Sequence, residues 1–242
     1  MNIKELTTQA SKLRASRQFA EAYQLVLNHT DEHQELKGLA WEHHPIFWSD
    51  IEAGICKLTR RKGSDSTFIE HLWRNQEFIY SFHRNAAEIP SDKELLEEIL
   101  EREFISTIGE SRSLHWVVRD KNSKPWGLLS LTDISLMHKR SEVMLGVIPG
   151  APTGLSTASM LILFNFYFNA IKFNKLCAYI YEDNMHSFKG TLHLGFKEEG
   201  RMRMHVMDPK SATYVDLIQL GMLTNDAFNP TNKRLMQRLL KR

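Results

Sequence analysis

The segment PGAPTGLSTASM, residues 149–160, has the composition of a ligand-binding turn that opens a helix. A strand-like run, SEVMLGVIP, leads into it, and an uncharged helical run follows. Backbone N–H groups in the first turn of a helix lack partners within the helix and lie at the positive end of its dipole. Such a helix start binds phosphate or pyrophosphate. Gly154 would let the backbone approach a phosphate, and Ser156 and Thr157 would add hydroxyl donors, although the same residues are equally suited to plain helix capping.

A second polar segment, EDNMHSFKGTLHLGF at residues 182–196, follows the strand-like run KLCAYIYE. Asn184 is placed to cap a helix, because its side-chain oxygen can accept a hydrogen bond from an N–H of the first turn. Gly195 is placed to end that helix, because glycine adopts the left-handed conformation of a helix C-terminus without strain. Phe196 is then expected to turn back toward the core.

Short apolar runs separated by polar turns must position these two segments. We expect strands near residues 55–62, 113–120, 126–136, 141–149, 175–182, 196–207 and 213–223. We expect helices that open near residues 67 and 91, a long helix over 153–171, and a helix that begins near residue 184. The resulting order, β-α-α-β-β-β-α-β-α-β-β, predicts an α/β fold around one central sheet.

Residues 1–50 have a different pattern and are predicted to form a small helical extension. Leu6, Ala10 and Leu13 recur at helical spacing, and so do apolar residues from Phe19 to Leu27. The segment resembles one tetratricopeptide-type hairpin. A single hairpin of that kind cannot bury its apolar face alone, so we expect it to pack on the main domain or on a protein partner. Residues 51–228 form the predicted main domain, and residues 229–242 a basic C-terminal tail.

The overall composition excludes several classes of function. Lys and Arg number 31 against 29 Asp and Glu, a balance that argues against nucleic-acid binding. The chain has no HExxH or CxxC motif, so we predict no metal site. Only two cysteines occur, far apart, which favours a reduced, cytoplasmic compartment. The uncharged stretch 143–171 is interrupted by proline and glycine, so we predict a buried helix and no membrane contact.

Taken in order, the segments GLLSLTDISLMHKRSEVMLGV, GLSTASMLILFNFYF, NMHSFKGTLHLGFKEEGRMR and YVDLIQLGML resemble the GNAT superfamily of N-acetyltransferases. Within it they look most like the branch of ribosomal-protein alanine, spermidine and sugar-nucleotide amine acetyltransferases. The resemblance covers about Gly54 to Phe228. It implies a GNAT fold, whose central mixed and mostly antiparallel sheet is splayed between the fourth and fifth strands, and acetyl-CoA as co-substrate.

The resemblance also implies which residues contact the coenzyme. The pantetheine arm of acetyl-CoA would pair with the backbone of the fourth strand, and its pyrophosphate would rest on the following helix start. The residues at these positions, together with two at the later helix start, are Leu145, Gly146, Val147, Ile148, Thr153, Gly154, Leu155, Ser156, Asn184 and Ser187.

Three positions depart from the family pattern. Ala151 stands where the family's loop usually carries Arg or Gln, and Ser156 replaces its second glycine or alanine. Thr191 stands where many relatives have a tyrosine that protonates the leaving thiolate, so Ser187 is the expected substitute acid. A thiolate needs little help to leave, since thiols have a pKa of about 8.5.

The implied reaction is the attack of an amine on a thioester. The amine must lose a proton first, and a carboxylate, directly or through a water molecule, can accept it. Glu142 is the first choice for this base; it shares a strand face with Met144, although it is equally expected as a solvated residue beside a turn. Asp133 and His115 are the next candidates. The amide of Gly146 or Val147 would donate to the oxyanion.

Tyr214 and Asp216 are expected to border the acceptor cleft, although Asp216 is also suited to organising a turn. The leading interpretation is an N-acetyltransferase for a primary amine of a small molecule, an amino sugar or a protein N-terminus. Two alternatives stay open: an acyltransferase whose donor is an acyl-carrier protein, and a non-catalytic binding module. Exposed strand edges leave a homodimer open as well.

Overall fold

The computed structural model describes residues 2–30, 36–82, 90 and 92–241. Its helices are α1 (Ile3–Ala15), α2 (Phe19–Leu27), α3 (Leu36–Glu42), α4 (Ser66–Arg74), α5 (Gln76–Phe82), α6 (Lys93–Ile105), α7 (Ile108–Ser111), α8 (Leu155–Phe164), α9 (Met185–His193), α10 (Thr224–Ala227) and α11 (Pro230–Leu239). Its strands are β1 (Ile51–Ala53), β2 (Cys56–Arg60), β3 (Leu114–Asp120), β4 (Pro125–Ser135), β5 (Arg140–Val147), β6 (Lys175–Tyr181), β7 (Lys197–Asp208) and β8 (Thr213–Leu223). Two 3₁₀ turns (Pro45–Trp48 and Gly63–Asp65) and a π-helical turn (Asn165–Ala170) complete the elements.

The eight strands form one sheet in the order β1-β2-β3-β4-β5-β6-β8-β7. Neighbouring strands are antiparallel except β5 and β6, which are parallel. The predicted mixed, mostly antiparallel sheet is therefore confirmed. The short strand β1 precedes the predicted strands, so the fourth and fifth strands of the sequence analysis are β5 and β6.

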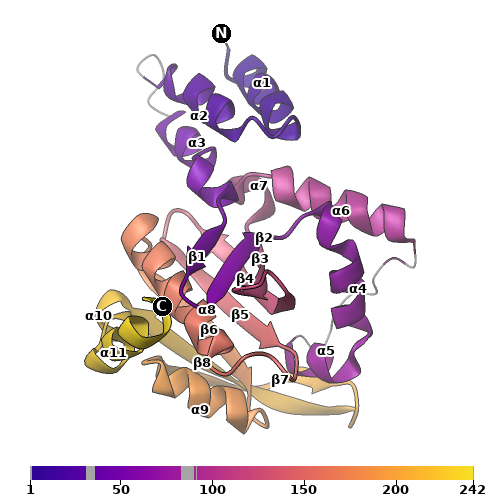
Figure 1. The fold of residues 1–242 in the computed structure, drawn as a ribbon, viewed down its shortest axis with the longest axis vertical. Coiled ribbons are helices and arrows are strands. Elements are labelled where there is room, and N and C mark those ends of the chain that lie inside the picture. Colours follow the sequence, from indigo (N-terminus) through magenta and orange to yellow (C-terminus); the bar gives the residue numbers. More distant parts are fainter. Residues whose placement is uncertain (1, 31–35, 83–89, 91, 242) are drawn as a thin grey trace.

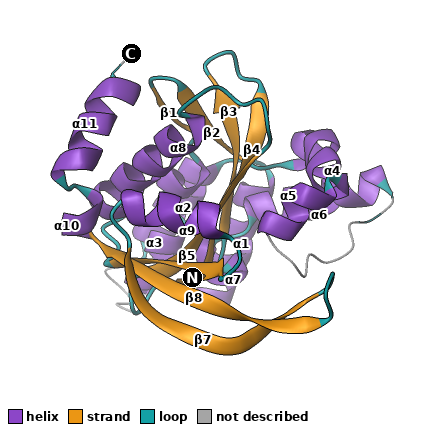
Figure 2. Cartoon of the chain, turned by 90° about the horizontal axis from the view of Figure 1, so that it is seen from below, coloured by secondary structure: helices purple, strands orange, loops and turns teal. Residues whose placement is uncertain are grey.

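Helices cover both faces of the sheet (Figures 1 and 2). Successive residues of a strand point to opposite faces. Trp116 on β3 and Leu129 on β4 accordingly belong to the large core that contains α8. Their neighbours Val117 and Leu128 belong to a smaller core beneath α4, α5 and α6. The two faces of the central strands thus carry different helical layers.

The uncharged helix is buried on nearly every side, as its composition predicts. It begins at Leu155, two residues later than expected, and after Phe164 it continues as the π-helical turn. Tyr167 in that turn is fully buried, and its hydroxyl donates to the backbone oxygen of Lys175 at 2.7 Å. A buried phenol needs such a partner, and the wider turn brings Tyr167 to it. In the described part of the chain, no helix has the length and apolarity needed to cross a bilayer.

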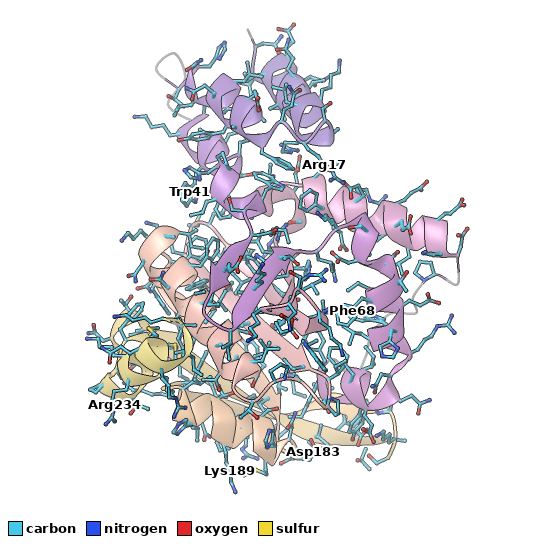
Figure 3. The ribbon with its side chains drawn as sticks, viewed as in Figure 1. Arg17, Trp41, Phe68, Asp183, Lys189 and Arg234 are labelled. Carbon is cyan, nitrogen blue, oxygen red and sulfur yellow. The ribbon has the colours of Figure 1, made fainter. Side chains whose placement is uncertain are left out.

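The N-terminal helices α1–α3 enclose a small core of their own, separate from the two cores of the sheet. They are anchored to α6 and α7 by Arg14, which is only 4% exposed, and by Phe19, whose ring packs on Phe104 of α6. The Arg14 guanidinium donates to the backbone oxygen of Ile105 at 2.9 Å and pairs with Glu110 at 2.9 Å. Arg17, labelled at this junction in Figure 3, pairs with Glu101 of α6. The extension is therefore packed on the main domain, as expected.

The segment predicted as a basic tail contains α11, which packs against α8. Asn232 is fully buried, and its amide donates to the backbone oxygens of Leu194 and Ala227. The backbone oxygen of Leu239 accepts a hydrogen bond from the N–H of Ile55. The helix thereby joins the loop after α9 to the turn between β1 and β2. The division at residues 50 and 228 stays a prediction.

Candidate active site

The sheet opens between β5 and β6. The two strands pair in only three positions, Arg140–Lys175, Ser141–Leu176 and Glu142–Cys177. Along the rest of their described lengths each strand stays paired on its other side, β5 to β4 as far as Val147 and β6 to β8 as far as Tyr181. The edge of β5 that faces the gap can therefore pair with the amide groups of an extended ligand.

Glu142 lies where this gap begins. It is half-buried, on the strand face that also carries Met144 and Gly146, and the Thr132 hydroxyl approaches its Oε2 at 3.5 Å. The pKa of Glu142 is raised to about 7, chiefly by burial. The hydrogen bond from Thr132 lowers this pKa by a smaller amount, and the nearby charge of Asp133 raises it further. A carboxyl group with a pKa near neutrality is suited to accept a proton at physiological pH.

Asp133 is occupied by two arginines. Its carboxylate pairs with Arg112 at 2.6 Å and with Arg140 at 2.8 Å, and its backbone has a φ of 45° within an irregular stretch of β4. This double ion pair gives Asp133 a role in joining the ends of β4 and β5.

His115 lies on the same sheet face as Glu142 but two strands away, in the row His115–Ser130–Met144. Strands are spaced about 4.8 Å apart, so His115 lies about 10 Å from β5. Its Nδ1 is 2.8 Å from the Ser130 hydroxyl. Burial, together with Arg61 and Arg60, holds its pKa well below the ordinary value, so the imidazole is neutral.

The loop between β5 and α8 contains two glycines with positive φ, Gly150 (87°) and Gly154 (86°). Gly154 is the N-cap of α8 and supplies no side chain to cap the described helix. Thr153 and Ser156 are exposed, whereas Leu155 is fully buried. The donors that this loop would offer to a phosphate are therefore the first-turn amides of α8.

A Cβ atom at Gly154 would lie 3.3 Å from Leu239 Cδ2 and 3.9 Å from Ile55 Cδ1. The glycine therefore also allows α11 and the β1–β2 turn to approach the loop. This contact places the basic helix α11 next to the predicted pyrophosphate site, a proximity that the sequence did not indicate.

The start of α9 forms the opposite side of the gap. The Asn184 side chain accepts a hydrogen bond from the Ser187 N–H at 3.2 Å, so its predicted capping role is confirmed. Ser187 is half-buried in the first turn. A small cleft of about 170 Å³ separates this turn from α5 and is lined by Tyr80, Ser81, Asp183 and Asn184. Asp183 is labelled at this end of α9 in Figure 3.

The end of α9 has the predicted glycine. Gly195 has a φ of 101°; its N–H donates to Leu192 and the Phe196 N–H to Thr191, the paired bonds of a Schellman motif. Phe196 is 2% exposed and belongs to the large core. The prediction of both residues from the sequence is confirmed.

Tyr214 and Asp216 lie on the part of the β7–β8 hairpin that extends beyond β6 (Figure 2). Tyr214 is 57% exposed. Asp216 accepts the Met204 N–H at 2.8 Å and pairs with Arg201, and both bonds lower its pKa. Asp216 therefore organises the bulge at Met204. Across the sheet, Glu142 pairs with Cys177 and Cys177 with Gly221 of β8. Asp216 lies five residues from Gly221 along β8, so it is displaced by about 17 Å along the strand direction from Glu142.

Sequence reasoning missed three residues at this site. Thr132 donates to Glu142, and its place directly opposite Glu142 depends on strand register. Phe78 and Phe82 of α5 lie over Gly146, where a Cβ atom would be 2.7 Å from each ring. Their spacing of four residues predicts a shared helix face, but it does not indicate which strand that face covers.

A family model described as an acetyltransferase (GNAT) domain matches residues 57–197, which is more than half of the chain. The chain belongs to the GNAT acetyltransferase family. The match runs from β2 to the start of β7 and includes the gap between β5 and β6. The predicted fold and the predicted class of enzyme, an acetyltransferase, are thereby confirmed.

Solved structures of similar fold include the spermidine N-acetyltransferase of Vibrio cholerae in complex with CoA and spermine. It has a TM-score of 0.62 and 19% identity, and the match covers 72% of this chain and 98% of that one. A dodecameric structure of the same enzyme in an intermediate state has a TM-score of 0.59 and 20% identity, with 72% and 96% covered. No curated protein compared with this chain matches it.

Proposed function

We propose that this acetyltransferase uses acetyl-CoA as donor and Glu142 as the general base. The observation that carries the proposal is the position of a carboxyl group with a pKa of about 7 where β5 and β6 separate. Glu142 and Gly146 share one strand face and lie four residues apart, about 13 Å along β5. The proton of the amine would therefore have to reach Glu142 along a chain of water molecules.

The residues around the gap suit the parts of a coenzyme A thioester. The free edge of β5 can pair with the amides of the pantetheine arm, and the first-turn amides of α8 can bind its phosphates. The amine nitrogen would attack the thioester carbon, the amide of Gly146 would hold the oxyanion, and the carbon–sulfur bond would then break. Ser187, at the opposite side of the gap, would relay a proton from solvent water to the thiolate that leaves, taking up one proton as it gives up another.

The acceptor is proposed to be a primary amine that enters by the cleft between α5 and α9. Spermidine and spermine belong in the first test panel, because spermine is bound in the similar Vibrio cholerae structure. Amino sugars attached to nucleotides and peptides with a free N-terminus complete the panel. Release of free thiol from acetyl-CoA in the presence of each amine measures the reaction. An absence of amine-dependent thiol release across the panel would contradict the proposal.

An acyl-carrier protein is a second candidate donor, favoured by the position of α11. The exposed basic residues of α11 are Lys233, Arg234 and Arg238, and Lys241 follows the helix. Leu239 of α11 lies beside Gly154 at the predicted pyrophosphate site. An acidic carrier would be attracted to such a surface. Binding of an acyl-carrier protein with no response to acetyl-CoA would favour this donor, and a response to neither would favour a binding module.

The cellular compartment, the absence of a metal and the assembly of the protein are proposed from the same structure. Cys56 and Cys177 are both free and buried, as suits a reducing, cytoplasmic compartment. Among the described residues, no three His, Cys, Asp or Glu side chains gather as metal ligands. In the described sheet β7 is an outer strand, so self-association through this edge stays a prediction that light scattering would test.

A further inference from the structure

Two stacked phenylalanines cover β5 at the place where the thioester is proposed to bind. Phe78 and Phe82 lie one helical turn apart on α5, with ring centroids 5.2 Å apart and planes inclined by 16°. A Cβ atom at Gly146 would be 2.7 Å from Phe78 Cε2 and 2.7 Å from Phe82 Cδ2. Any side chain at position 146 would therefore displace the rings, and glycine allows them to contact the backbone directly.

The rings are held in this position from several sides. Phe78 is 7% exposed and belongs to the small core beneath α4, α5 and α6. Trp73 packs against both rings, with centroid distances of 6.4 and 6.3 Å. The Tyr80 hydroxyl, on the same helix, donates to Asp208 at 3.0 Å and so ties α5 to the β7–β8 hairpin. The rings are therefore a fixed part of the site.

The opposite face of β5 is closed as well. Val143 and Leu145 point to that face and pack in or against the large core, where Leu155 and Ala158 of α8 are fully buried. A carbon chain attached to a thioester at Gly146 thus meets the α8 core on one face and the aromatic pair on the other. The cleft between α5 and the start of α9, lined by Tyr80, Ser81, Asp183 and Asn184, has a volume of about 170 Å³.

We propose that the Phe78–Phe82 pair restricts the acyl group of the donor to a short chain such as acetyl. The inference rests on the proposed function, since it takes the thioester to lie at Gly146. Phe78 and Phe82, which lie outside the family's coenzyme motifs, would then select acetyl-CoA over longer acyl-CoA thioesters.

The test compares the dissociation constants of acetyl-CoA and butyryl-CoA, measured calorimetrically, for the wild type, Phe82→Ala and Phe78→Leu. The wild type should bind butyryl-CoA more weakly than acetyl-CoA. Both variants should reverse this order, because each buried methylene favours binding about fourfold, or roughly fifteenfold for the two by which butyryl exceeds acetyl. Phe68→Ala is the matched control: Phe68 packs against the same small core but is not among the atoms closest to Gly146. It should keep the wild-type ratio.

The ratio of the two dissociation constants, measured on one protein preparation, does not depend on the fraction of protein that is folded. The inference is overturned if the wild type binds butyryl-CoA as tightly as acetyl-CoA, or if both variants keep the wild-type ratio. In either case acetyl-CoA still binds, and the proposed function survives. If the wild type binds neither thioester, the proposed coenzyme itself is wrong and the inference fails with it.

Discussion

Replacing Glu142 with Gln should abolish most of the activity and at the same time stabilise the protein at alkaline pH. The loss of activity follows from its role as base, since a positioned base typically contributes 10²–10⁴-fold to the rate. The gain in stability follows from the burial of the same carboxyl group, which the folded protein keeps protonated to a higher pH than the unfolded chain does.

The magnitude follows from the pKa of Glu142, raised from an ordinary 4.5 to about 7. Below pH 4.5 the carboxyl group is protonated in both states and its titration costs nothing. Between pH 4.5 and 7 the unfolded chain ionises first, so stability falls as the pH rises. Above pH 7 the full cost applies, about 3 kcal/mol at about 1.36 kcal/mol per pH unit. Partial exposure of the side chain reduces the expected value to about 1–3 kcal/mol.

Two assays follow. Thermal unfolding of wild type and Glu142→Gln from pH 4 to pH 9 should give equal midpoints near pH 4 and a higher midpoint for the variant at pH 8, by about 2–4 °C per kcal/mol. The profile of kcat/KM against pH should rise through about 7 in the wild type. The variant should lose this inflection and keep only the rise due to deprotonation of the amine.

Glu198→Gln is the matched control, because Glu198 is an exposed carboxylate on β7. It should change neither the unfolding midpoint nor the kinetic profile. Full activity of Glu142→Gln with an unchanged inflection near pH 7 would refute the assignment of the base. Asp133→Asn and His115→Gln would then become the variants to compare.

Two further predictions concern the scaffold that holds the site. Arg14→Met should lower the free energy of unfolding by about 1–3 kcal/mol, because it leaves the Ile105 backbone oxygen without its donor and removes the ion pair with Glu110. Arg17→Met, whose side chain is 54% exposed, should cost less than about 1 kcal/mol. Equal effects of the two variants in denaturant titrations would contradict this anchoring role. Gly195→Ala should lower the free energy of unfolding by about 1–3 kcal/mol, because Gly195 has a φ of 101° and the new Cβ would lie 2.7 Å from Asn229 Nδ2. Its control is Gly190→Ala within α9, which has open space around it and should raise the free energy of unfolding by about 0.5–1 kcal/mol. A Gly195→Ala protein as stable as the wild type would show that the Schellman turn is dispensable.

Local signals in the sequence were sufficient wherever neighbouring residues decide the structure. Asn184 caps α9 and Gly195 ends it because both roles depend on backbone groups within one helical turn. The uncharged stretch after Gly154 predicts a buried helix because a helix apolar on all sides must be covered by other elements. The gap between β5 and β6 was expected from the family resemblance, and the limited pairing of the two strands agrees with it.

Contacts between distant elements had to come from the tertiary structure. The sequence by itself established the fold class, the family, the helix start at Gly154 and a short set of candidate acids. It placed Glu142 first and Asp133 next as candidate base, but it could not show how their surroundings differ, because both are carboxylates on adjacent strands. Their difference arises in the folded chain, where Arg112 and Arg140 bind Asp133 while burial beside Thr132 leaves Glu142 with a pKa near 7. Burial and ion pairing depend on residues far apart in the chain, and only packing brings those residues together.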